Sequence, residues 1–193
     1  MIPKLNLVSA LAALVFFFLP WVSIECRGER MARQTGVQMI IGSATATDRG
    51  KDEQNKFSDE GESLGHSYLG AAALVAILGA LLMAFASLLV GRRDLDRGCG
   101  TLCAVALLCL LIQVSVGFPA EKAIREDILK PPSSKGARVN IDLGEMGQTL
   151  QKEVLAGIRV SPMPWFYWEL AALALPTLVL GNALLDRIKA KES

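Results

Sequence analysis

The sequence predicts a membrane protein: an all-α four-helix transmembrane bundle with a small extracytoplasmic β-sheet formed by two long loops. Three observations lead to this fold class. The chain has 193 residues, of which 52% are hydrophobic, and these gather in four blocks. Two of the blocks, 68–90 and 99–118, contain no charged residue. Both long loops, 22–67 and 119–164, contain stretches in which apolar and polar residues alternate, as they do in strands.

The first block, residues 5–21, is predicted to be a retained transmembrane helix. A lysine followed by an apolar core also fits a cleaved signal peptide. However, residues 16–21 read FFFLPW, with no small-x-small cleavage site nearby. Trp21 also suits the membrane–water boundary, where tryptophan is enriched. We therefore interpret the block as the first span.

The second and third blocks form a predicted transmembrane hairpin. Residues 68–90 and 99–118 are each long enough to cross a bilayer core of about 30 Å at about 1.5 Å per residue. The turn between them, 91–98, carries five charged residues. A soluble bundle is the alternative, but its helices would each show a polar face. These helices are apolar all round, which favours the membrane.

Small residues predict where these helices pack most closely, because a small-x-x-x-small pattern lets two helix backbones approach. The expected packing positions are Gly70, Gly79, Ala80, Ala84, Gly100 and Ala104.

The first long loop, 22–67, is predicted to hold two strands. Apolar and polar residues alternate over 22–27, and glycines bound a β-rich run, GVQMIIG, at 36–42. The acidic stretch 43–65 has too few apolar residues to form a core, so we expect it to be mobile.

The second long loop, 119–164, is predicted to begin with an amphipathic helix at 119–129, opened by a proline. Alternating stretches near 137–143 and 157–161 predict two further strands. Together the four strands would form one sheet above the membrane. The alternative is four unrelated loop segments.

The fourth span is predicted at 165–185, followed by a polar tail at 186–193. Aromatic residues concentrate at membrane interfaces. We expect a membrane-interface belt made of Trp21, Trp165, Phe166, Tyr167 and Trp168.

The density of lysine and arginine predicts the orientation. The three short segments at 1–4, 91–98 and 186–193 hold seven basic residues in 20 positions, whereas the two 46-residue loops hold six and seven. Cytoplasmic segments carry the excess of basic residues. Both termini and the turn with Arg92, Arg93 and Arg97 are therefore expected in the cytoplasm, in a plasma or bacterial inner membrane.

One ionisable residue lies inside a predicted span. An intramembrane carboxyl group such as that of Glu169 is costly and marks a candidate functional site. Its position four residues beyond Trp165 also allows an interfacial carboxylate that is hydrogen-bonded to a neighbouring helix. Gln113 and Asn182 are the other polar candidates, either as interhelical hydrogen-bond partners or as part of a transport path.

The cysteines argue against a membrane thiol oxidoreductase. Cys99 and Cys103 form Cys-x-x-x-Cys, and Cys26 is the single cysteine in the predicted outer loops. Thiol exchange across the membrane needs a resolving partner on the outer side. We expect no enzyme activity, no cofactor and no metal. The formal net charge of +1 argues against nucleic acid as a partner.

Four spans, inside termini and strands in both outer loops make a layout that resembles the claudin-like tetraspan proteins. The resemblance implies a sheet from both loops seated on a left-handed four-helix bundle. Trp21 and Cys26 occur where that family has its loop motif, but Gly-Leu-Trp and a second loop cysteine are missing. The resemblance therefore concerns architecture and transfers no functional residue.

The sequence favours a non-catalytic subunit that has a structural, accessory or assembly role in a membrane complex. Its expected partners are the lipid bilayer and other membrane subunits, or further copies of itself. The alternative is a small oligomeric transporter or channel that uses Glu169, Gln113 and Asn182.

Overall fold

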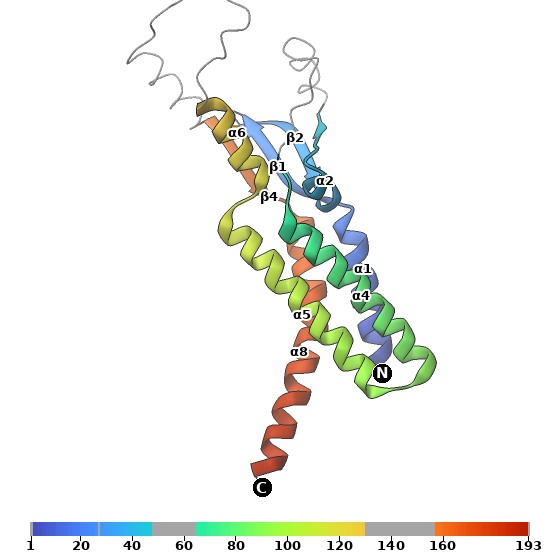
Figure 1. Ribbon diagram of the computed structural model, residues 1–193. Coiled ribbons are helices and arrows are strands. Elements are labelled where there is room, and N and C mark those ends of the chain that lie inside the picture. Colours follow the sequence, from blue (N-terminus) through green and yellow to red (C-terminus); the bar gives the residue numbers. More distant parts are fainter. Residues whose placement is uncertain (1, 27, 48–64, 130–156, 193) are drawn as a thin grey trace, which may run out of the picture.

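The structure, a computed structural model, describes residues 2–26, 28–47, 65–129 and 157–192. These residues are mostly helical and include three long apolar helices and a small four-stranded antiparallel sheet (Figure 1). The long helices run side by side, and the sheet lies at one end of them. The elements are α1 (Ile2–Phe17), β1 (Pro20–Cys26), β2 (Glu29–Thr35), α2 (Gly36–Ile41), β3 (Thr45–Ala46), α4 (Tyr68–Val90), α5 (Arg93–Val116), α6 (Pro119–Leu129), β4 (Ile158–Pro162) and α8 (Pro164–Glu192).

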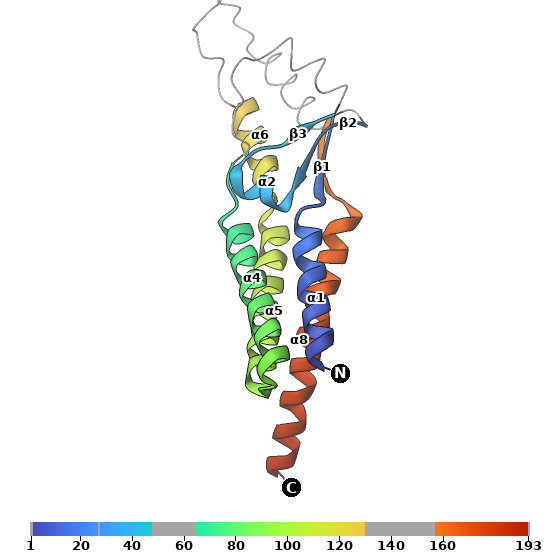
Figure 2. The same ribbon diagram turned by 90° about the vertical axis from the view of Figure 1, so that its right-hand side faces the viewer.

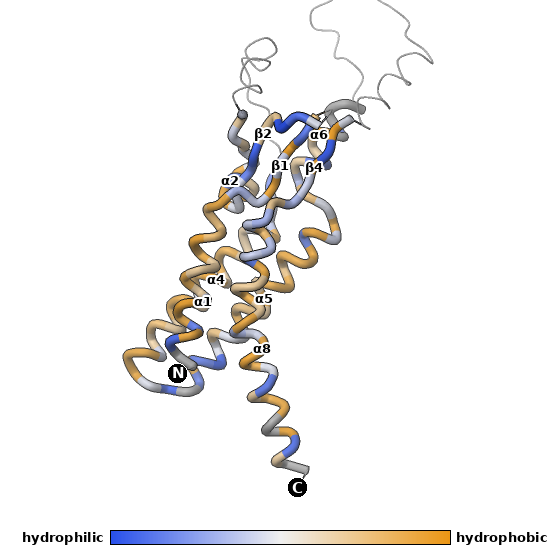
Figure 3. Tube along the Cα trace, turned by 180° about the vertical axis from the view of Figure 1, so that it is seen from behind, coloured by the Kyte–Doolittle hydropathy of each residue, from blue (hydrophilic) through white to orange (hydrophobic). Residues whose placement is uncertain are grey.

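Three helical stretches are long and apolar enough to cross a membrane, judged by length and composition: Tyr68–Val90, Asp94–Ile124 and Pro164–Ala190. A shorter apolar helix covers Lys4–Phe17. Apolar residues cover the long helices, whereas polar residues gather in the sheet, at the α4–α5 turn and toward the end of α8 (Figure 3). This distribution is typical of a membrane protein.

The helices pack through small residues. α4 lies against α5, α1 against both α4 and α8, and α5 against α8 (Figure 2). The face that α4 buries consists largely of alanine, at Ala73, Ala76, Ala80 and Ala84. Small side chains let the backbones of neighbouring helices approach closely, so these helices pack without large side chains between them.

The sheet joins segments from opposite parts of the chain. Its strand order is β3-β2-β1-β4, with every pair antiparallel. β1 follows α1, and β4 precedes α8; Val22 pairs with Pro162 and Ile24 with Val160. One sheet therefore contains strands from both long loops, and it includes two of the four predicted strands, those near 22–27 and 157–161.

The predicted strand at 36–42 is wrong, because this segment forms the helix α2. Thr35 and Gln38 make a reciprocal capping box: the Thr35 hydroxyl accepts from the Gln38 N–H at 3.2 Å, and the Gln38 side chain accepts from the Thr35 N–H at 3.0 Å. Gly42 ends the helix at φ +79°. These local caps outweigh the β-propensity of the run between them.

The second strand of the first loop is instead β2, whose sequence is ERMARQT. It lacks alternation between apolar and polar residues, so its pattern gives no strand signal. Pairing with β1 makes it a strand. This is a tertiary effect that the local sequence does not carry.

Several helix ends also differ from the expected ones. α1 ends at Phe17, and β1 begins at Pro20, so the predicted first span at 5–21 is too long. α8 continues to Glu192 through most of the predicted tail at 186–193, because DRIKAKE consists mostly of good helix formers.

The predicted turn at 91–98 is shorter, because only Gly91 and Arg92 separate α4 from α5. Gly91 has φ +70° and donates its N–H to the Ser87 carbonyl, which ends α4. Asp94 and Asp96 lie in the first turn of α5, where negative charge complements the helix dipole.

α6 and β4 occupy the regions near 119–129 and 157–161 where a helix and a strand are predicted. The strand predicted near 137–143 lies outside the described residues. So does most of the acidic stretch at 43–65, of which residues 43–47 and 65 are described and include β3.

Candidate functional site: polar groups between the helices

Glu169 is enclosed in the interior of the helices. Its side chain is 0% exposed, and within the described structure neither carboxyl oxygen has a hydrogen-bond partner. Phe166 and Leu173, about one turn to either side on α8, are also fully buried. Among the described residues it is the only buried Asp, Glu, Lys or Arg. The structure thus places the carboxyl inside the protein, without the interhelical hydrogen bond that an interfacial carboxylate would need.

Gln113 is an interhelical hydrogen-bond partner. Its side-chain oxygen accepts from the Ser67 hydroxyl at 2.6 Å, and its amide donates to the Gly117 carbonyl at 2.8 Å. The Ser67 hydroxyl also accepts from the Gly70 N–H at 2.8 Å, which caps the first turn of α4. Gln113 therefore ties the start of α4 to the end of α5. Ser67 is a hydrogen-bond partner of Gln113 that the sequence did not single out.

Asn182 lies far from both of these groups. It is exposed, and it lies 13 residues beyond Glu169 on α8, about 20 Å at about 1.5 Å per residue. The structure therefore does not bring Glu169, Gln113 and Asn182 together at one site.

Two polar residues that the sequence did not single out are buried on α1. Asn6 and Ser9 are 2% and 4% exposed, and the Asn6 side-chain oxygen has no hydrogen-bond partner in the described structure. Their i, i+3 spacing inside an apolar block is the signal that could have found them, since it places both on one helix face.

The predicted aromatic belt divides into two groups. Trp165, Tyr167 and Trp168 are exposed on α8, as a belt requires. Trp21 and Phe166 are instead fully buried, and their rings pack edge to face with centroids 5.4 Å apart. These two rings belong to the core between sheet and helices.

Trp21 is the central residue of this junction. Its indole N–H donates to the Phe16 carbonyl at 2.9 Å, and its ring packs on Phe17 at 4.5 Å. Phe118, at the end of α5, extends the cluster through Phe166 at 6.0 Å. The cluster therefore holds β1, α1, α8 and the end of α5 together.

The predicted packing residues lie within or beside the helix contacts. Gly70, Ala80, Ala84 and Gly100 are buried, while Gly79 and Ala104 are partly buried. A Cβ atom on Gly100 would lie 2.9 Å from the Leu180 Cβ and 3.2 Å from the Pro176 carbonyl oxygen. α5 thus contacts the backbone of α8 directly, at the proline within that helix.

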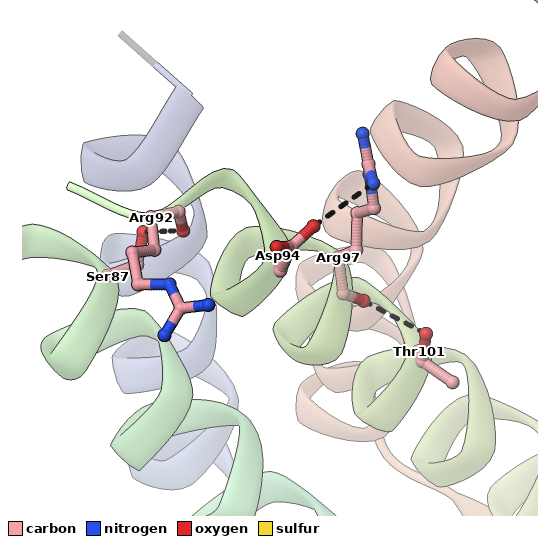
Figure 4. Close-up of polar contacts among 5 residues, drawn as sticks. All are labelled: Ser87, Arg92, Asp94, Arg97 and Thr101. Atoms are coloured by element: carbon pink, nitrogen blue, oxygen red, sulfur yellow. Dashed lines mark hydrogen bonds and ion pairs between the residues drawn. The ribbon is translucent and has the colours of Figure 1, made fainter. Parts of the chain in front are cut away.

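The arginine-rich turn lies at the end of the helices opposite the sheet (Figure 1). Arg92 is exposed, and Arg97 pairs with Asp94 at 3.2 Å (Figure 4). An exposed pair three residues apart on one helix adds little stability. Arg93 begins α5. The turn therefore presents basic groups without using them in the core.

The cysteines are all free thiols, at Cys26, Cys99, Cys103 and Cys109. Cys99 and Cys103 are buried one turn apart on α5, while Cys26 lies in β1. Across the described residues, no group of three or more His, Cys, Asp and Glu side chains is placed to hold a metal ion.

No family model matches the chain, and no curated protein shows significant similarity to it.

Proposed function

We propose that the chain is an integral membrane protein that spans the bilayer four times as a helix bundle, with α1 as the first span in addition to the three long apolar helices. α1 supports this proposal because it packs along both α4 and α8. Its 16 residues reach about 24 Å, which is somewhat short of a bilayer core of about 30 Å. A mismatch of this size is met by local thinning of the bilayer at modest cost.

The proposed orientation puts the sheet outside and both termini in the cytoplasm of a plasma or bacterial inner membrane. Both ends of the chain lie at the end of the molecule opposite the sheet (Figure 1). The basic turn with Arg92 and Arg97 lies at that end too. This agrees with the excess of basic residues in cytoplasmic segments. The resulting layout is similar to that of the claudin-like proteins in architecture.

The proposed function is that of a non-catalytic accessory or assembly subunit, whose outer sheet contacts a partner protein. One observation carries it: pairing of β1 with β4 builds a single surface from both loops. The aromatic cluster around Trp21 fixes this surface on the helices. The hydrogen bond from Ser67 to the buried Gln113 joins two helices, which supports a packing role for this polar group.

Charged side chains supply the polar part of this surface. Arg33 pairs across the strands with Ser23, and Arg159 pairs with Glu25, so both arginines stand on the same side of the sheet. Both are exposed. An exposed arginine suits a protein interface, where this residue is enriched.

The test is the size of the complex that the chain forms in its native membrane after gentle solubilisation. We expect the wild type to co-purify with another membrane protein, and the double variant Arg33→Glu/Arg159→Glu to lose that partner. Lys189→Glu, which reverses the charge of one exposed residue at the other end of the molecule, should retain it. A monomeric wild type without a partner would contradict the proposal.

The transporter or channel alternative has less support. A conducting path needs its polar groups in one continuous line, whereas the exposed Asn182 lies about 20 Å along α8 from Glu169 at about 1.5 Å per residue. Gln113 is also occupied by its hydrogen bonds to Ser67 and Gly117.

A further inference from the structure

We propose that Glu169 is a proton-binding site: a carboxyl group enclosed between helices that the folded protein holds as a neutral acid at neutral pH. This inference stands independently of the accessory-subunit proposal, because it rests on the interior of the helices and not on the outer sheet.

The carboxyl of Glu169 is enclosed by the helices that pack around α8. Glu169 is 0% exposed, so the surrounding helices shield its carboxyl from bulk solvent. α8 packs against α1 and α5, whose buried residues include the apolar Ala10, Ala13, Ala106 and Leu110. The buried polar residues of these two helices, Asn6, Ser9 and Gln113, make no hydrogen bond to either Glu169 oxygen, so they do not replace the hydration that the carboxyl loses on folding.

No group compensates a negative charge on Glu169 within the described structure. A buried carboxylate needs a cation or several hydrogen-bond donors, because an uncompensated buried ion costs several kcal/mol. Within the described structure neither Glu169 oxygen accepts a hydrogen bond, and no Lys, Arg or His is buried. Addition of a proton is the remaining way to neutralise the group.

The titratable neighbours do not supply a positive charge. On α5 they are the thiols of Cys99, Cys103 and Cys109, of which the first two are buried. The charged residues of α5 lie in its first turns, at the end of the helix away from the sheet (Figure 1). On α1, Lys4 is exposed near the far end of the helix, and on α4 the titratable residue is the exposed Tyr68. In the strands, Glu25 is partly buried and Arg159 is exposed.

A bound proton has a consequence for stability. A glutamate in an unfolded chain in water titrates near pH 4.3, so it is ionised at neutral pH. If the folded protein keeps the proton, folding takes up one proton, and stability falls as the pH rises. The folding equilibrium constant should drop about tenfold per pH unit, from about pH 5 until the folded protein itself releases the proton.

Infrared difference spectroscopy on the full chain in lipid bicelles tests the protonation state directly. At pH 7, the spectrum of the wild type minus that of Glu169→Gln should contain the carbonyl stretch of a neutral carboxylic acid and no carboxylate bands. The matched control is Glu126→Gln, at an exposed position on α6, whose difference spectrum should contain carboxylate bands. Carboxylate bands from Glu169 at pH 7 would overturn the proposal.

Thermal unfolding between pH 5.5 and 8 gives the second measurement. The wild-type midpoint should fall across this interval relative to that of Glu169→Gln, which cannot ionise at this position. Parallel pH profiles of the two proteins would contradict the proposal. If Glu169→Gln does not fold, the wild-type spectrum serves in its place: at pH 7 it should contain the carbonyl band of a neutral carboxylic acid. Absence of that band at pH 7 would be equally decisive against it.

Discussion

Replacing Trp21 by alanine is expected to lower the free energy of unfolding by about 3–5 kcal/mol, the usual cost of removing a buried aromatic side chain. The indole is fully buried and contacts Phe17 and Phe166, so the substitution leaves a cavity between the sheet and the helices. It also removes the hydrogen bond to the Phe16 carbonyl. The loss should be measured as a lower midpoint of thermal unfolding in detergent, accompanied by a weaker near-ultraviolet circular dichroism signal.

Trp168→Ala is the matched control. Trp168 is the same residue type in the same predicted belt, but 58% of it is exposed. Its removal should change the unfolding midpoint in detergent only slightly, because little of its surface is withdrawn from solvent on folding. If the two variants lost equal stability, Trp21 would not be the junction between sheet and helices that the structure describes.

Replacing Gly100 by alanine is expected to destabilise the protein by about 1–3 kcal/mol, the range found for overpacked interiors. The added Cβ would lie 2.9 Å from the Leu180 Cβ, a distance that real contacts essentially never reach, and 3.2 Å from the Pro176 carbonyl oxygen. Neither is the tip of a flexible side chain, so α5 and α8 must move apart. The change should appear as a lower unfolding midpoint.

Gly181→Ala provides a control of opposite sign. Gly181 lies on α8, and a Cβ atom there would meet nothing within 4 Å. Alanine is a better helix former than glycine by about 1 kcal/mol, so this variant should be equally stable or more stable than the wild type. A stabilising Gly100→Ala would show that α5 and α8 do not pack as closely as described.

The helical hairpin and two of the strands were accessible from sequence because their signals are local. The uncharged blocks ending at Val90 and Phe118 leave few alternatives to long apolar helices. β1 and β4 alternate apolar and polar residues, and the structure pairs them. β2 was missed because its charged residues, such as Arg30 and Arg33, interrupt the alternation of apolar and polar residues that indicates a strand. Its pairing with β1 depends on tertiary contacts and not on its local sequence.

The candidate site was less predictable. Sequence alone marks Glu169 and Gln113 as unusual but does not show their partners, which come from other helices or are absent. Trp21 and Phe166 are aromatic residues near the ends of predicted spans, as expected for an interface belt. Only the packing of their rings against each other shows that they belong to the core. The helix α2 was misread because a capping box at Thr35 competes with the β-propensity of the residues that follow it.

The central claim is that strands from both long loops form one sheet on one side of the membrane. Both chain termini and the turn between α4 and α5 lie on the other side. Cysteine labelling tests it most directly, using Cys26→Ser as the parent. A membrane-impermeant maleimide applied to intact cells should label Arg33→Cys and Arg159→Cys above the parent level. Asp94→Cys, in the first turn of α5, should react only after the membrane is permeabilised. All three residues are exposed in the structure. Labelling of Asp94→Cys in intact cells, or protection of either strand position, would contradict the account.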